Sequence, residues 1–297
     1  MSTRERTAPR VHTPVVRLGT TEQCMRLRET CGHRPPPRIA PPHRRIATSP
    51  PMTPTRRGHY GVDGPHVLYG LAALAFGGAI ATVITLTAYR AVTPALEAIA
   101  VLVALVSSSD LWTRRRGTFA VGSELLDGLA LQGDERRLDA GCGRGAVLTL
   151  AAQRLPQGQA VGVGLWSTKD PSGNRERATL RNAELEGVRE RVMVLTADIR
   201  SLPFPDCNFD VVTRSLALHH IAAAAGREQA LAEILRVLKP GGTALIADIG
   251  RTWAYQRFLA DQPGTLVERR VLGWRFWFGG PHLATALISV MRTRTAD

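Results

Sequence analysis

Lysine is almost absent from this 297-residue chain, although the chain is strongly basic. Lys169 and Lys239 are the two lysines among its 38 basic residues, and the predominance of arginine suggests a GC-rich coding genome. Cysteine is also scarce, and no pair of cysteines has the spacing of metal ligands, so the sequence predicts no metal site. The four cysteines are interpreted as thiols in a reducing cytosol.

A basic surface for nucleic acid is not indicated either, because the charge is unevenly distributed. Residues 1–60 contain twelve arginines and three glutamates, so most of the net charge of +13 belongs to this stretch. It is rich in proline, has no apolar periodicity and lacks the apolar centre of a secretory signal. We predict a disordered basic tail over residues 1–60 and no nucleic-acid partner. A second interpretation is that translation begins at Met52.

Two apolar stretches follow the tail. Val67–Tyr89 carries no formal charge over 23 residues, and at about 1.5 Å per residue it would span roughly 34 Å, enough for a bilayer core of about 30 Å. A buried helix of a soluble protein is the alternative. Ala91–Trp112 is a weaker second stretch, interrupted by Glu97 and Asp110, and Thr93 followed by proline indicates its helix start. Residues 61–113 are predicted to form a transmembrane helical hairpin.

Arginine pairs and triplets flank this hairpin. Arg56-Arg57 precedes it and Arg114-Arg115-Arg116 follows it, so the positive-inside rule places both flanks in the cytoplasm. The expected location is therefore the cytoplasmic membrane, with residues 114–297 facing the cytoplasm and with membrane contact through residues 67–112.

Residues 137–148 predict a strand, a glycine loop and a helix. An apolar approach ends in Asp139, and Gly141, Gly143 and Gly145 alternate with other residues before a helix-like run begins. Glycines at this spacing permit positive φ angles and a close backbone approach to a ligand, while the helix start presents free N–H groups. A plain turn is the alternative. The G-x-G-x-G spacing is not the G-x-G-x-x-G of dinucleotide-binding folds.

The segments after the loop repeat the alternation of strand and helix. Strands are expected at 159–166, at 191–196, from Val211 and at 243–248, with helices at 174–187 and 227–238. Three strings, D-x-G-x-G-x-G from Asp139, L-P-F-x-x-x-x-F-D from Leu202 and L-K-P-G-G from Leu238, occur in this order. Together they resemble class I S-adenosylmethionine (SAM)-dependent methyltransferases of the quinone-biosynthesis type. The likeness extends over roughly residues 60–297 and is closest to bacterial members that carry an amino-terminal membrane hairpin.

This resemblance implies an α/β fold, a Rossmann-like sheet of seven mostly parallel strands with an antiparallel strand near the end, over residues 114–297. It also implies SAM as the cofactor. Asp198, which follows the third strand, matches the acid that accepts the adenine amino group, with a helix or turn cap as its alternative role. The cofactor-binding residues that the resemblance implies are Asp139, Gly141, Cys142, Gly143, Gly145, Gly164, Leu165, Asp198, Ile199 and Ser215.

The sequence departs from the family pattern at Gly164. The family usually has an acid there, at the end of the second strand, where a carboxylate takes the ribose hydroxyls. Either another group compensates, with Asp170 as the nearest acid, or the affinity for the cofactor is reduced. If the backbone resembles that of the family, Gly164→Asp would be expected to tighten SAM binding.

His219 and His220 lie just past the fourth strand, at the edge where open α/β sheets bind ligands. Either could accept a proton from an acceptor hydroxyl or acidic carbon, and a packing role is the alternative for each. The aromatic residues between Gly273 and Gly280 are expected to line an apolar pocket, to belong to the core or to anchor at a membrane interface.

The predicted function is a membrane-tethered methyltransferase that acts on a small or lipophilic, lipid-like acceptor. The alternative of another class is a membrane-anchored SAM sensor or scaffold without turnover, which the missing acid at Gly164 motivates. A nicotinamide oxidoreductase fits less well, because its glycine spacing is absent. The acceptor and the oligomeric state do not follow from the sequence.

Overall fold

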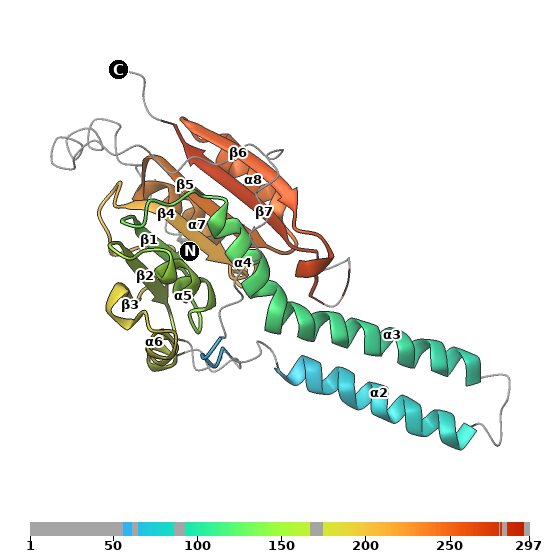
Figure 1. Ribbon diagram of the computed structural model, residues 1–297. Helices are drawn as coiled ribbons and strands as arrows, with labels where there is room; N and C mark the ends of the chain where they lie inside the picture. The colour runs from blue at the N-terminus through green and yellow to red at the C-terminus, as the bar shows by residue number, and fades with distance from the viewer. Residues whose placement is uncertain are drawn as a thin grey trace, which may run out of the picture.

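The computed structural model describes residues 56–60, 65–85, 93–166, 175–278, 280 and 284–293. Its centre is a seven-stranded sheet with the order β3-β2-β1-β4-β5-β7-β6 (Figure 1). The pairs from β3 through β5 are parallel, and β7 is antiparallel to both β5 and β6. The predicted Rossmann-like sheet with one antiparallel strand is confirmed. The strands are β1 (Arg136–Ala140), β2 (Gln159–Gly164), β3 (Val192–Thr196), β4 (Phe209–Ser215), β5 (Leu238–Asp248), β6 (Thr265–Val271) and β7 (Ala286–Arg292).

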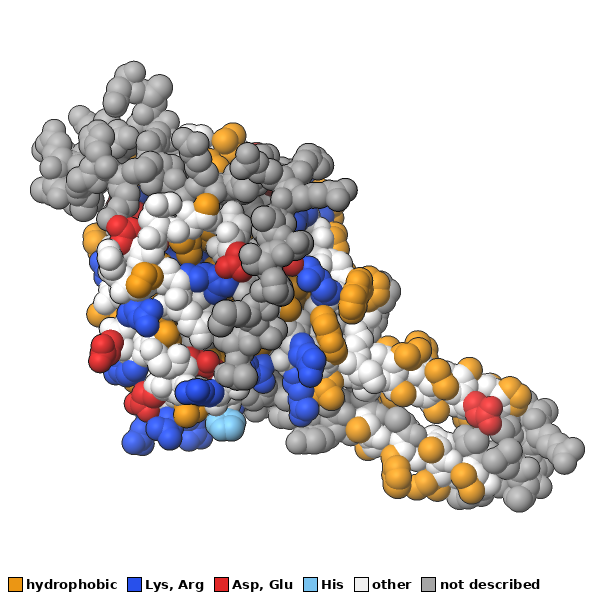
Figure 2. Space-filling model, in the orientation of Figure 1, with side chains coloured by type: hydrophobic (Ala, Val, Ile, Leu, Met, Phe, Trp, Pro, Cys, Tyr) orange, Lys and Arg blue, Asp and Glu red, His pale blue; other side chains and the backbone are white. Residues whose placement is uncertain are grey.

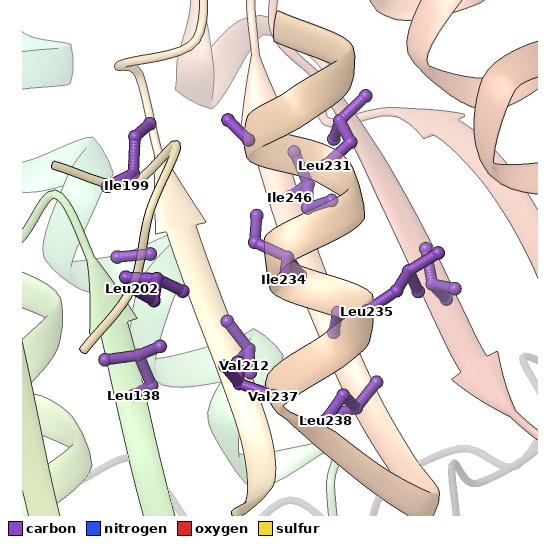
Figure 3. Close-up of a cluster of buried hydrophobic side chains, with 14 of the residues drawn as sticks. Leu138, Ile199, Leu202, Val212, Leu231, Ile234, Leu235, Val237, Leu238 and Ile246 are labelled. Carbon is purple, nitrogen blue, oxygen red and sulfur yellow. The ribbon is translucent and has the colours of Figure 1, made fainter. Parts of the chain in front are cut away.

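Helices cover both faces of the sheet, because alternate strand residues point to opposite sides. On one face, α7 presents Leu231, Ile234 and Leu235, at helical spacing, to Val212 and Ile246 of the strands (Figure 3). On the other face, α4 and α5 bury a second apolar cluster that includes strand residues of β4, β5 and β7. The helices of this unit are α4 (Thr118–Asp127), α5 (Ala146–Gln153), α6 (Glu176–Leu185), α7 (Ala224–Val237) and α8 (Thr252–Ala260), with short turns η2 (Arg189–Arg191) and η3 (Trp274–Phe276).

Strand β5 begins earlier than the sequence predicts. A helix was expected over 227–238 and a strand over 243–248, but Leu238 already pairs with Phe209 of β4. The register then shifts between Phe209 and Val211, so that Val211 pairs with Thr243. A bulge of this kind accommodates proline and glycine within a strand without breaking the pairing on either side. The L-K-P-G-G string therefore bends the start of β5, and α7 ends at Val237.

Two helices, α2 (Pro65–Thr85) and α3 (Thr93–Trp112), lie side by side and project from the sheet unit (Figure 1). Among the described residues a single helix, Pro94–Asp127, is long and apolar enough to cross a membrane, judged by length and composition. The described part of α2 contributes a shorter apolar stretch, Ala72–Ala81. The predicted hairpin of two membrane-spanning helices is therefore not supported, although the antiparallel pairing of the two helices is present.

The long helix joins the projecting part to the sheet unit. It consists of α3, the π-helical turn η1 (Thr113–Gly117) and α4 without a break, and α4 packs onto the sheet face. Only 6% of an 18-residue apolar stretch of this helix is buried against the described part of the chain. This stretch is therefore not a core helix. Figure 2 shows hydrophobic side chains along both projecting helices, with charged side chains concentrated on the sheet unit.

Residues 56–60 are packed onto the sheet unit, although they fall inside the predicted disordered tail. The backbone N–H groups of Arg57 and Gly58 donate to Glu186 Oε1 at 3.1 and 2.8 Å, and the His59 N–H donates to Asn182 Oδ1 at 2.7 Å. The Tyr60 hydroxyl lies 2.9 Å from Thr149 Oγ1. Hydrogen bonds to α6 and to Glu186, the residue that caps it, thus hold these five residues of the predicted tail on the sheet unit. Residues 1–55, with Met52 among them, lie outside the described residues.

Arg137, on β1, is an unusual member of the core. Its side chain is buried, and none of its guanidinium nitrogens has a hydrogen-bond partner among the described residues. Burial lowers its pKa to about 10, opposed by the nearby charges of Asp139 and Glu135. Burying a cation removes it from water, and this desolvation lowers the stability of the folded protein. Hydrogen bonds to a carboxylate would offset the cost.

Replacing Arg137 by methionine is therefore expected to stabilise the protein. Apolar replacements of buried charged groups often gain about 1–4 kcal/mol, so the melting temperature of the full chain in detergent should rise by several degrees. Arg136→Met is the matched control, because the Arg136 guanidinium donates to Asn208 Oδ1 at 2.6 Å and lies over the Phe209 ring. The control should lower the melting temperature, and a fall for Arg137→Met would contradict the interpretation of Arg137.

Candidate cofactor and acceptor site

The strand order reverses between β1 and β4, which is where open α/β sheets bind ligands at the carboxyl ends of their strands. The glycine loop follows β1 at this point, and Ser215 ends β4 beside it. All three loop glycines have positive φ, +91° at Gly141, +52° at Gly143 and +83° at Gly145. The sequence-predicted loop therefore has the backbone that only glycine adopts readily.

Close neighbours fix the shape of the loop. A Cβ atom on Gly141 would lie 2.5 Å from Nη1 of Arg214, and that nitrogen donates to the Ala140 carbonyl. The N–H groups of Gly141 and Cys142 both donate to the Val163 carbonyl at 2.9 Å, which joins the loop to β2. Because no side chain projects from Gly141, a ligand and the Arg214 guanidinium can both approach the backbone. These features fit a nucleoside cofactor cradled by the loop.

The far end of the loop is held by α6. Gly145, in the left-handed region, precedes α5, and Thr179 Oγ1 donates to the Gly143 carbonyl at 2.7 Å. Asn182 Nδ2 donates to the Arg144 carbonyl at 2.9 Å. The same side-chain amide accepts from the His59 N–H through Oδ1 and donates to the His59 carbonyl through Nδ2. The packed segment 56–60 and the glycine loop thus share one side chain, which the sequence did not indicate.

Asp139 lies beneath the loop and is 3% exposed. Burial raises its pKa to about 6, opposed by a hydrogen bond from Thr213 Oγ1 at 3.3 Å and by the positive charges of Arg137 and Arg214. Burial also lowers the pKa of Arg214 to about 10, opposed by Asp248 and Asp139. Cys142 is buried, which raises its thiol pKa and makes it an unreactive packing residue.

Gly164 ends β2 with a φ outside the positive region, so its backbone resembles an ordinary strand end. An added Cβ atom would nevertheless lie 3.0–3.1 Å from three carbons of the Trp166 ring. An acid at this position therefore requires the Trp166 ring to shift by a few tenths of an ångström. Leu165, between them, is exposed, and Asp170 lies outside the described residues.

Asp198 follows β3, as predicted, and Ile199 beside it is buried in the main core cluster. Both carboxylate oxygens of Asp198 accept from Arg200, with Nε distances of 3.0 and 2.9 Å and an Nη2 distance of 2.5 Å. These hydrogen bonds lower the pKa of Asp198. The carboxylate expected to meet adenine is thus already engaged by Arg200, which the sequence analysis did not anticipate.

His219 and His220 lie at the same sheet edge, but their surroundings differ. His219 Nδ1 lies 2.6 Å from Oδ1 of Asp248, and the His219 N–H donates to Asp248 Oδ2 at 3.1 Å. Asp248 ends β5 and is fully buried. An ionised carboxylate only accepts hydrogen bonds, so this contact favours the tautomer in which Nδ1 is the donor. The His220 ring packs on His219 with centroids 4.0 Å apart.

The sequence analysis missed Asp248 as a functional residue. It lies 29 positions from His219, and only the pairing of parallel strands brings their ends together. An acid at the carboxyl end of a central strand was the available signal.

An apolar cleft opens next to Ser215. Its walls come from α4, from the ends of β4 and β5 and from the aromatic segment that follows β6. Two aromatic residues of this segment have different surroundings. Phe276 lines the cleft, whereas Trp274 is exposed and packs its ring on that of Trp112 in α3. The lining residues include Val121, Leu125, Val147, Ala247, Leu272 and Phe276.

Comparison with known proteins relates part of the sheet unit to a known family. Residues 138–246 match the family model described as a methyltransferase domain. A ubiquinone/menaquinone biosynthesis C-methyltransferase of Dinoroseobacter shibae is 32% identical over 127 residues, 43% of this chain and 47% of that protein. A demethylmenaquinone methyltransferase of Symbiobacterium thermophilum is 29% identical over 155 residues, 52% of this chain and 55% of that protein. This chain thus spans about half the length of these curated relatives.

A solved SAM-dependent methyltransferase of Aquifex aeolicus superposes with a TM-score of 0.47 at 19% identity, covering 60% of this chain and 93% of that one. The matched family, its order of motifs and the sheet topology agree with one another. The chain carries a class I SAM-dependent methyltransferase domain, distantly related to the quinone-biosynthesis methyltransferases, with SAM as the methyl donor typical of this family.

Proposed function

We propose that this protein transfers a methyl group from SAM to a small or lipophilic acceptor while tethered to a membrane. The observation that carries the proposal is the meeting of three features at one sheet edge: the glycine loop, the His219–Asp248 pair and the apolar cleft. Equilibrium binding of S-adenosylhomocysteine, the demethylated product, and of NADH to the full chain tests the cofactor class. Binding of NADH in place of S-adenosylhomocysteine would refute the proposal.

Within this proposal the cofactor residues are those of the loop, with Asp139 beneath it, and Asp198 and Ile199 at the adenine end. SAM supplies an activated methyl group, so the protein mainly aligns an acceptor nucleophile with it, an effect that reaches about 7–11 kcal/mol in favourable cases. His219 is the proposed base, because Asp248 holds its ring and leaves Nε2 able to take a proton from the acceptor. Ser215 lines the cleft.

A SAM sensor without turnover remains the second candidate. It is favoured by the absence of an acid at Gly164 and by the engagement of Asp198 with Arg200, both of which remove anionic contacts expected of a tight cofactor site. Transfer of labelled methyl groups distinguishes an enzyme from a sensor.

Membrane attachment is proposed to depend on α3. Val101, Leu102 and Leu105 are each about 60% exposed on this helix, and an aspartate costs about 2.5–3.5 kcal/mol at the centre of a membrane-spanning helix. Leu102→Asp/Leu105→Asp should therefore release the full chain from carbonate-washed membranes. Leu266→Asp is the matched control, because Leu266 is equally exposed on β6 but lies outside the projecting helices.

The control variant should remain in the membrane fraction, as should the wild type. Wild-type protein recovered in the soluble fraction would refute the tether, and release of the control would show that the assay reports general destabilisation.

A further inference from the structure

The end of β2 is joined directly to the glycine loop. Gly164 pairs with Thr196, the last residue of β3, and Val163 accepts the two loop hydrogen bonds described above. A side chain that covers this strand end therefore lies at the edge of the proposed cofactor pocket. In related nucleotide-binding folds a carboxylate at this position takes the ribose hydroxyls.

The Trp166 ring lies against the position from which such a carboxylate would project. Its six-membered ring lies within 3.1 Å of the position of a Cβ atom on Gly164. Its Nε1–H donates to Thr196 Oγ1 at 2.9 Å, so the indole bridges the ends of β2 and β3. The ring also packs against the apolar cluster that contains Cys142 and Leu148.

The backbone conformation of Trp166 indicates that surrounding contacts hold its ring in this position. Its φ is +50°, in the left-handed region, which is rare for a bulky side chain. Such conformations persist where surrounding contacts over-determine them, and they are concentrated at ligand sites. The contacts with Thr196 and with the loop cluster hold the ring in place despite this backbone conformation.

We propose that Trp166 is a specificity-determining residue of the cofactor pocket, in which its ring replaces the carboxylate and gives the ribose an aromatic wall. The inference rests on the proposed function, because it assumes a nucleoside cofactor. A carboxylate accepts hydrogen bonds from both ribose hydroxyls and thereby selects them. An indole ring offers an apolar face and an N–H donor already bound to Thr196, so it contributes little selection for those hydroxyls.

The test is calorimetric titration of the full chain in detergent with S-adenosylhomocysteine and with its 2′-deoxy analogue. Wild type should bind the two within about 5-fold of each other, because no charge-assisted hydrogen bond to the hydroxyl is lost. Trp166→Ala should weaken binding of S-adenosylhomocysteine at least about 5-fold through loss of the aromatic contact. Trp166→Phe is the matched control, because it keeps a ring and loses the hydrogen bond to Thr196, and it should stay within about 5-fold of wild type.

A second pair of variants tests whether an acid at position 164 can take the place of the Trp166 ring. Gly164→Asp alone should not tighten binding, because its Cβ meets the indole. In the Trp166→Ala background the same substitution has room, so the double variant should bind S-adenosylhomocysteine more tightly than Trp166→Ala. It should also disfavour the 2′-deoxy analogue by more than about 5-fold, the mark of a carboxylate at the ribose.

Three results would overturn the inference: Trp166→Ala weakening binding less than 5-fold, wild type rejecting the deoxy analogue by more than 5-fold, or Gly164→Asp alone tightening binding. Each would leave the cofactor loop itself in place. Wild type that binds neither nucleoside would instead refute the proposed function, so the two failures are distinguishable.

Discussion

Replacing Gly141 by valine is expected to weaken SAM binding by about 100-fold or more, equivalent to about 2.7 kcal/mol. Gly141 has a φ of +91°, where a β-branched residue is strained. The new Cβ would also meet the Arg214 guanidinium, which contacts the Ala140 carbonyl under the loop. The loop must then move away from the position in which its backbone approaches the cofactor. Calorimetric titration with SAM measures the loss, and circular dichroism reports retention of the fold.

Gly187→Val is the matched control for this prediction. Gly187 also has a positive φ, +70°, but no atom of the described residues lies within 4 Å of an added Cβ, and Gly187 follows α6 and is not part of the loop. The control should lose stability from backbone strain while keeping its affinity for SAM. Equal loss of affinity in both variants would mean that strain alone, and not the shape of the loop, accounts for the result.

Replacing His219 by glutamine is expected to reduce the rate of methyl transfer by about 10²–10⁴-fold, the usual contribution of a positioned general base. SAM affinity should change little, because the imidazole serves the acceptor. The measurement is the initial rate of label transfer from SAM, with SAM affinity measured separately by calorimetric titration.

Asp248→Asn tests the positioning role of the buried carboxylate. The amide can present its N–H group to Nδ1 and favour the wrong tautomer, so the rate of methyl transfer should fall while SAM affinity changes little. His220→Gln is the control, since the Asp248 carboxylate contacts His219 whereas the His220 ring packs on the His219 ring, and this variant should retain most of the activity. A larger loss for His220→Gln than for His219→Gln would exchange the roles of the two histidines.

Local patterns were sufficient for much of the fold. The glycine spacing predicted the loop after β1, and Thr93 with its proline predicted the start of α3 at that residue. The pattern of residues 227–238 predicted the helix α7, which buries Leu231, Ile234 and Leu235, because helical periodicity is visible within a single segment. Such features depend on neighbours a few positions apart.

Contacts between segments far apart in the chain could not be predicted from such local patterns. The pairing of His219 with Asp248 depends on strand order, and the docking of residues 56–60 on α6 depends on Asn182 and Glu186 more than 120 positions away. The Trp166 ring folds back over Gly164 because Trp166 has a positive φ, which the sequence pattern does not predict. The candidate site was therefore located from the sequence, whereas the groups that alter its chemistry emerged only in three dimensions.

The most direct test of turnover is transfer of labelled methyl groups from SAM into native membranes, followed by organic extraction. The account predicts that the full chain places label in an extracted small molecule or lipid. It also predicts that Gly141→Val does not, and that His219→Gln does so far more slowly. Binding of S-adenosylhomocysteine by the wild type with no transfer into any fraction would contradict the account and identify the protein as a sensor.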